Sequence, residues 1–204
     1  EVGISHKNEM EILSDILQPD EAVLTNIAPA HLENFDSLDS IGFEKFKLLD
    51  NAKDNIFFQE EFRSYNCKKD AFYVLSKTLK AGPHTINYAT QRISCGWNIS
   101  INDLKFPVPF PVGDGTIQTF TLAIAVALKN GVPPALLQER LLLWRPFQNR
   151  GIWKVVGRKH YFIDCYNANP ASYRDSLQHF YNEKPKNAPA CFILGSMEEL
   201  GPKS

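Results

Sequence analysis

The most informative segment of the sequence is HYFIDCYNANP, residues 160–170. An apolar run ends at Asp164, a polar turn follows, and Pro170 stands where a helix can begin. In open α/β sheets, ligands bind outside the carboxyl ends of the strands, and a helix N-terminus at that edge favours anions. The segment therefore suits a nucleotide or a phosphate. The structural alternative is a simple turn in which Asn169 caps the helix that starts at Pro170.

Strands and helices alternate along the rest of the chain, which predicts an α/β protein. Apolar residues at helical spacing predict helices over 8–18, 38–52, 117–130, 133–144 and 170–181. The third helix is expected to be capped by Thr116, after a turn at Asp114-Gly115. Strands are predicted over 21–27, 55–59, 71–76, 85–89, 153–156, 160–165 and 190–195, and antiparallel sheet with a proline-rich edge over 92–112. We expect a domain boundary within 145–150.

Composition narrows the class of protein. The 204 residues are 44% hydrophobic and 22% charged, as in soluble globular proteins, which argues against a disordered or collagen-like chain. A formal net charge of −1 argues against a dominant electrostatic surface for nucleic acid. No uncharged apolar run approaches the ~20 residues of a membrane span, and the N-terminus is no signal peptide. The chain begins without methionine and stops just after an apolar run, so we expect a piece of a longer protein.

The cysteines give no sign of a disulfide framework or a zinc site. Cys67, Cys95, Cys165 and Cys191 form no CxxC pair. Three of them sit within apolar or aromatic stretches, so we expect small buried hydrophobes in a reducing compartment.

Two further segments place reactive side chains near predicted strands. His31 follows the predicted strand over 21–27 within a few residues, so it can point into a cleft and bind a metal or move a proton. Lys45 and Lys47 flank Phe46 in the next predicted helix. A lysine turned toward a cleft can take unusual chemistry, because burial favours its neutral amine. The plainer alternatives are a surface or capping histidine and solvated lysines.

Several of these segments resemble motifs of a known protein family. The YNANP motif at 166–170, after an apolar strand with Asp164, resembles the C-terminal signature of the Mur ligases, most of all the type that adds D-alanyl-D-alanine. Arg150 falls where that type has the arginine that opens its C-terminal domain. Other segments resemble it in the same order: EVGI (1–4) with NEME (8–11), TNIAPAHLENF (25–35), the lysine-bearing helix (41–49) and ILGSMEELG (193–201). The resemblance spans nearly the whole chain.

The resemblance implies a fold and an activity. Residues 1–146 would be the central ATPase domain without its N-terminal phosphate-binding part, a mostly parallel sheet flanked by helices with a small antiparallel portion. Residues 147–204 would be the truncated first part of a Rossmann-like C-terminal domain. The parent would be a cytoplasmic, monomeric, ATP- and Mg²⁺-dependent ligase of peptidoglycan synthesis, with no nucleic-acid or membrane partner. It would join D-alanyl-D-alanine to UDP-N-acetylmuramoyl-tripeptide through an acyl phosphate.

The resemblance also implies roles for particular residues. Mg²⁺ would be held by Glu1, His31 and Lys45, with Lys45 as its carbamate, and His31 and Lys45 would be catalytic. The nucleotide would be bound by Arg150, Asp164, Tyr166, Asn167, Asn169 and Asn26.

Several positions depart from the family pattern. The family's G-x-H-N-x-x-N segment is GDGTIQT here, at 113–119, and Ser196 replaces an aspartate. The chain contains no G-x-x-x-x-G-K-[ST] phosphate-binding loop, so we expect that it does not turn over ATP by itself. Two alternatives stay open. One is another Mur ligase or a folylpolyglutamate-synthetase-like ligase, and the other is a degenerate, non-catalytic relative that binds nucleotide or a partner protein.

Overall fold

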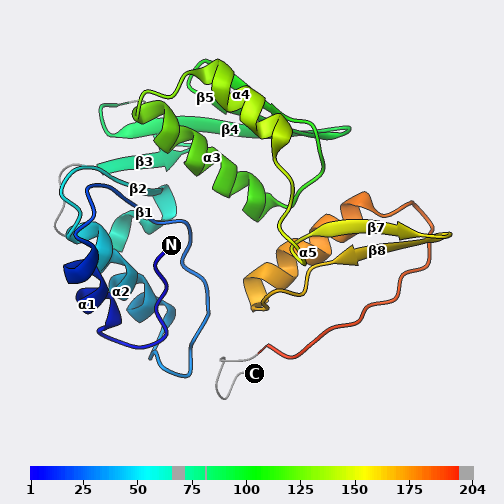
Figure 1. Ribbon diagram of the computed structural model, residues 1–204, viewed down its shortest axis with the longest axis horizontal. Coiled ribbons are helices and arrows are strands. Elements are labelled where there is room, and N and C mark those ends of the chain that lie inside the picture. The colour runs from blue at the N-terminus through cyan, green and yellow to red at the C-terminus, as the bar shows by residue number, and fades with distance from the viewer. Residues whose placement is uncertain (66–71, 81, 198–204) are drawn as a thin grey trace.

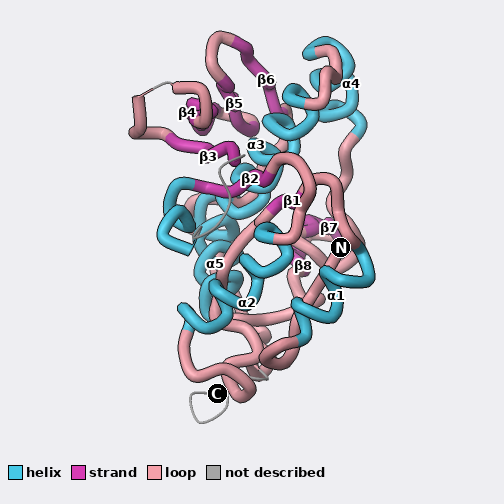
Figure 2. Tube along the Cα trace, turned by 90° about the vertical axis from the view of Figure 1, so that its left-hand side faces the viewer, coloured by secondary structure: helices cyan, strands magenta, loops and turns pink. Residues whose placement is uncertain are grey.

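The computed structural model describes residues 1–65, 72–80 and 82–197. Its centre is a six-stranded sheet whose strands lie in chain order: β1 (Ala22–Val23), β2 (Ile56–Gln59), β3 (Phe72–Ser76), β4 (Thr85–Ile93), β5 (Gly96–Ile101) and β6 (Leu104–Val108). The strands from β1 to β4 pair in parallel, and those from β4 to β6 pair antiparallel. Figure 2 shows this succession in magenta. The predicted α/β fold with a small antiparallel portion is thus confirmed.

Helices cover both faces of this sheet (Figure 1). α1 (Glu9–Leu17) and α2 (Leu38–Asp50) lie on one face, and α3 (Asp114–Lys129) and α4 (Pro134–Leu143) lie on the other. A short 3-10 helix, η1 (Glu60–Tyr65), follows β2. Successive side chains of a strand point to opposite faces. In β2, Phe57 accordingly packs in the core with α3, while Ile56 and Phe58 pack in the core with α2.

After α4 the chain forms a smaller unit. β7 (Ile152–Val156) and β8 (Lys159–Ile163) make an antiparallel hairpin, and α5 (Pro170–Glu183) packs on it through aromatic rings. The centres of the stacked Trp153 and Phe180 rings are 5.6 Å apart. Figure 1 shows this unit beside α3. The domain boundary at 146/147 falls in the connection between α4 and β7 and stays a prediction.

Two predictions about the start of α3 are wrong. Asp114-Gly115 belongs to the first turn of the helix, and the N-cap is Gly113 rather than Thr116. Gly113 has no side chain to cap the helix. Instead, the Asp175 carboxylate of α5 accepts a hydrogen bond from the Gly115 N–H at 3.3 Å. A cap supplied from 60 positions away leaves no local signal in the sequence.

Two predicted strands also differ from the structure. The strand over 21–27 is confined to Ala22–Val23, and residues 190–195 form no strand. Ile193, in the second of these segments, is 97% exposed. No strand of the described chain pairs with 190–195, and an extended segment needs a neighbour to form ladder hydrogen bonds.

The prediction of buried cysteines is wrong for the three that the structure describes. Cys95, Cys165 and Cys191 are free thiols on the surface. Cys67, residue 71 of a predicted strand and residues 198–204 lie outside the described residues. Within the described ranges, no helix is long and apolar enough to cross a membrane.

Candidate functional site

Lys45 and the loop after β1 form a first cluster of predicted site residues. α2 buries Phe46 in the same core as Ile27, which follows β1. The neighbouring Lys45 reaches this loop, where its Nζ donates a hydrogen bond to the Asn26 carbonyl oxygen at 2.9 Å. Burial lowers the pKa of the Lys45 ammonium, because surroundings of low dielectric disfavour its charge. Lys45 is half-buried, so the alternative of a fully solvated lysine does not hold for it.

The carboxylate next to Lys45 is engaged by another helix. Glu44 is 5% exposed, forms an ion pair with Lys47 Nζ at 2.9 Å and accepts a hydrogen bond from the Met10 N–H at 3.1 Å. Burial alone would raise the pKa of this carboxyl. The Lys47 ammonium and the N–H groups at the start of α1 outweigh that effect and hold the pKa of Glu44 below its ordinary value. Glu44 and Lys47 thus tie α2 to the N-terminus of α1.

Glu1 and His31 lie close to the same core. Figures 1 and 2 both show the N-terminus beside β1. Val2, Ile4 and Leu32 pack with the core on the α2 face, so the residues next to them stay near it. Glu1 is exposed, and His31 is half-buried with a left-handed backbone at φ 56°. The described residues contain no group of three or more His, Cys, Asp or Glu placed to hold a metal. A metal at Glu1 and His31 would therefore need further ligands.

A second cluster lies where β8 runs into α5. Arg150 Cζ is 3.9 Å from the centre of the Tyr166 ring, which is a cation–π contact. Asp164 is half-buried and accepts a hydrogen bond from the Ser176 hydroxyl of α5. The order of strand, turn and helix N-terminus predicted from residues 160–170 is present.

The two asparagines of this turn make structural hydrogen bonds. Asn167 Oδ1 accepts from the Ala168 N–H at 2.8 Å. Asn169 Oδ1 accepts from the Ser172 N–H at 2.9 Å, and the Ser172 hydroxyl accepts from the Asn169 N–H at 3.0 Å. This capping box is the structural alternative that the sequence left open. It fixes the start of α5 next to Asp164.

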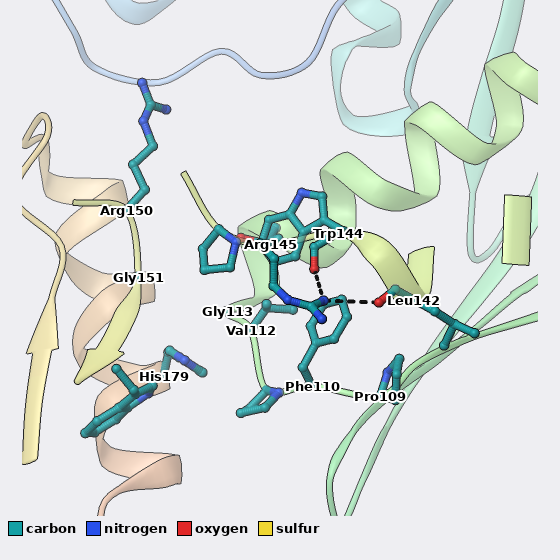
Figure 3. A pocket seen from close by; sticks show the side chains of 14 residues that line it. Pro109, Phe110, Val112, Gly113, Leu142, Trp144, Arg145, Arg150, Gly151 and His179 are labelled. Carbon is teal, nitrogen blue, oxygen red and sulfur yellow. Dashed lines mark hydrogen bonds between the residues drawn. The ribbon is translucent and has the colours of Figure 1, made fainter. Parts of the chain in front are cut away.

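A pocket of about 480 Å³ lies between the sheet and the smaller unit. Figure 3 shows His179 and Gly151 on one side of it and Phe110 and Trp144 on the other. His179 Nδ1 and Trp153 Nε1 are buried and have no hydrogen-bond partner within the described residues. Burial lowers the pKa of His179, which favours the neutral imidazole. Unpaired buried nitrogens beside a cavity are groups that a ligand or an ordered water can satisfy.

Residues 1–112 match the family model of the Mur ligase middle domain. The chain belongs to the Mur ligase family. This Mur ligase chain is 46% identical along its whole length to the UDP-N-acetylmuramoyl-tripeptide–D-alanyl-D-alanine ligase of Haemophilus influenzae. It is 28% identical, over 98% of its length, to the ligase of the same name from Borreliella burgdorferi. It covers 45% and 44% of these two relatives, so it spans less than half of their length.

Solved structures share the fold of this Mur ligase chain. MurF from Acinetobacter baumannii matches with a TM-score of 0.83 at 22% identity, over 100% of this chain and 46% of its own. MurF from Thermotoga maritima in complex with ADP matches with a TM-score of 0.68 at 18% identity, over 94% of this chain and 45% of its own.

Sequence reasoning about this Mur ligase missed three residues at the junction of its two parts. His179 and Trp153 line the pocket, and Asp175 caps α3. No motif or spacing in the sequence marks any of these three residues. Their importance comes from the packing of α5 against α3, which local patterns do not encode.

Proposed function

We propose that this chain is part of an ATP-dependent ligase that joins D-alanyl-D-alanine to UDP-N-acetylmuramoyl-tripeptide in peptidoglycan synthesis. The observation that carries the proposal is the 46% identity, over the whole chain, to a ligase that bears this name. The strand, turn and helix N-terminus at the start of α5 support it, because they suit a nucleotide. ATP and a UDP-sugar as substrates would place the enzyme in the cytoplasm.

In the proposed reaction, ATP phosphorylates the terminal carboxylate of the tripeptide, and the amine of the dipeptide attacks the acyl phosphate. Most of the catalysis in such a transfer is positioning and neutralisation of charge. The Arg150 guanidinium would neutralise phosphate oxygens, and its stacking on Tyr166 limits the directions in which it can point. Asp164 and the YNANP turn would orient the nucleotide. Since Asn169 uses its side-chain oxygen in the cap, its contact with the nucleotide would come from the amide nitrogen.

The donor set near β1 fits Mg²⁺ only in part. Mg²⁺ prefers oxygen ligands and usually takes one or two from protein, with water and phosphate supplying the rest. Glu1 offers a carboxylate and His31 an imidazole, but the Lys45 ammonium is a donor with no lone pair. We propose that Lys45 reacts with CO₂ as its neutral amine, which burial favours, and so presents carbamate oxygens. When bound, Mg²⁺ would supply charge neutralisation at the transferred phosphate.

The test is an assay of the full-length protein that contains this chain. With ATP, Mg²⁺ and UDP-sugar tripeptide, we expect release of ADP and formation of an amide when D-alanyl-D-alanine is added. We expect no product when a single amino acid, such as glutamate, replaces the dipeptide. The 204-residue chain alone serves as the control and is expected to release no ADP. A product with a single amino acid would instead support another ligase of this architecture. Nucleotide binding without any product would support a non-catalytic relative.

A further inference from the structure

One face of α5 carries three titratable residues and lies against the rest of the chain. Asp175, His179 and Glu183 are spaced four residues apart, so they share one side of the helix. Asp175 meets the N-terminus of α3, His179 lines the pocket, and Glu183 pairs with Arg92 of β4. This face of α5 is therefore a contact between the two parts of the chain.

The N-terminus of α3 is shaped to receive Asp175. A Cβ atom added at Gly113 would lie 2.6 Å from Asp175 Oδ2, and one added at Gly115 would lie 3.1 Å from it. Two glycines thus give the carboxylate the room to approach the backbone. The Gly115 N–H donates to Asp175 Oδ2 at 3.3 Å, while the N-cap Gly113 has no side-chain acceptor. A carboxylate at this place satisfies an unpaired N–H group and interacts favourably with the helix dipole.

This contact tolerates little change in geometry. Burial raises the pKa of Asp175, the Gly115 N–H acts against that rise, and the Asp114 carboxylate adds to it. A half-buried carboxylate beside a like charge is costly unless it keeps its hydrogen-bond donor. While the two helices stay packed, a shift that broke this hydrogen bond would leave the carboxylate without its donor, so the contact favours one register of α5 against α3.

We propose that Asp175 is a positioning residue for the nucleotide cleft, an inference that rests on the proposed function. α5 begins at the YNANP turn, and Asp175 lies about 8 Å further along the helix axis from Pro170. Because the helix is rigid over this distance, the contact of Asp175 with α3 sets where the turn stands relative to the pocket. Without the contact, the two parts separate more easily. ATP then binds a protein in which the docked arrangement is less populated, which lowers the apparent affinity of the protein for ATP.

The experiment compares three variants of the full-length ligase. Asp175→Ala removes the cap, and Asp175→Asn keeps an oxygen that can accept from the Gly115 N–H. Asp103→Ala changes an exposed aspartate between β5 and β6 and is the control. We expect Asp175→Ala to raise the KM for ATP about 3- to 30-fold, the range of a lost N-cap, with a smaller change in kcat. Asp175→Asn should restore most of the KM. An unchanged KM in Asp175→Ala, or no recovery in Asp175→Asn, overturns the inference.

A second readout keeps this inference separate from the proposed function. If the wild-type protein forms no amide, the proposed function fails, and the distance between the two parts still tests the role of Asp175. Dyes on the exposed Cys95 and Cys191, with the other cysteines replaced by serine, report that distance by energy transfer. Asp175→Ala should lower the transfer efficiency in the nucleotide-free protein, and Asp175→Asn should not. Equal efficiencies in wild type and both variants overturn the inference.

Discussion

Glu44 is a buried carboxylate that joins two helices, and its replacement should be costly. Glu44→Ala leaves the Met10 N–H without its acceptor, which costs about 1–3 kcal/mol of folding free energy. Glu44→Gln keeps an acceptor and should lose less. Because the folded state lowers the pKa of Glu44, its contribution is complete above the ordinary value of 4.5 and is lost as the pH falls through the lowered value. Thermal unfolding at several pH values measures both effects, and an alanine variant as stable as the wild type would contradict this account.

Some contacts of the candidate-site residues can be predicted from the sequence, and others cannot. The cap at Asn169 follows from its position before Pro170, and the capping box is present. The hydrogen bond of Lys45 to the Asn26 carbonyl joins two elements that are close only after the sheet has formed. The same holds for Arg150 over Tyr166. The metal and nucleotide roles of these residues stay predictions.

The helices of this chain are easier to predict from the sequence than its strands. All five predicted helices are present, because their hydrogen bonds and apolar spacing lie within one segment. The start of α3 was missed since its cap comes from Asp175 on α5. Residues 190–195 have the composition of a buried strand, but a strand also needs a paired neighbour.

The contact between α5 and the sheet should depend on pH through His179. The charged groups around its ring are Glu183, Arg92, Asp175 and Asp164. Burial lowers the pKa of His179 in the docked state, so docking should weaken as the pH falls from the ordinary value of 6.5 to the lowered value. Docking raises the pKa of Asp175 instead, so protonation of this carboxyl strengthens docking. This second effect grows as the pH falls from the raised pKa to the ordinary value of 3.8.

Energy transfer between Cys95 and Cys191 can follow this docking from about pH 8 to about pH 5. We expect the efficiency of the wild-type protein to fall within the histidine window. The matched control is His179→Leu, which fills similar space without a proton to gain, and its efficiency should not fall there. An equal fall in both proteins would assign the pH dependence to another group.

For the molecule as a whole, the buried side chains are unevenly distributed. Both hydrophobic cores lie on the six-stranded sheet, and their last buried member along the chain is Leu141. In the described part of β7, β8 and α5, His179 is the one buried residue. Stability follows the amount of apolar surface that is removed from water. The hairpin and α5 therefore depend on aromatic stacking and on their contacts with α3 and β4.

Hydrogen exchange of the 204-residue chain should reveal this difference in stability. We expect the amides of β2 and β5 to exchange slowest. The side chains of β2 pack in both cores, and β5 is paired on both sides and buries three side chains in the core with α3. The amides of β7, β8 and α5 should exchange faster through local opening. α3 lies on the sheet and touches α5, so it is the internal reference within the same digest. Trypsin should cut first at Arg150, in the connection that carries the exposed Phe147, because the bond from Arg145 to Pro146 resists trypsin. Asp175→Ala should speed exchange in α5 more than in β5, because it removes one of the contacts that dock the helix. Uniform protection across both parts, or cleavage that begins within the sheet, would show that the two parts unfold as one cooperative unit.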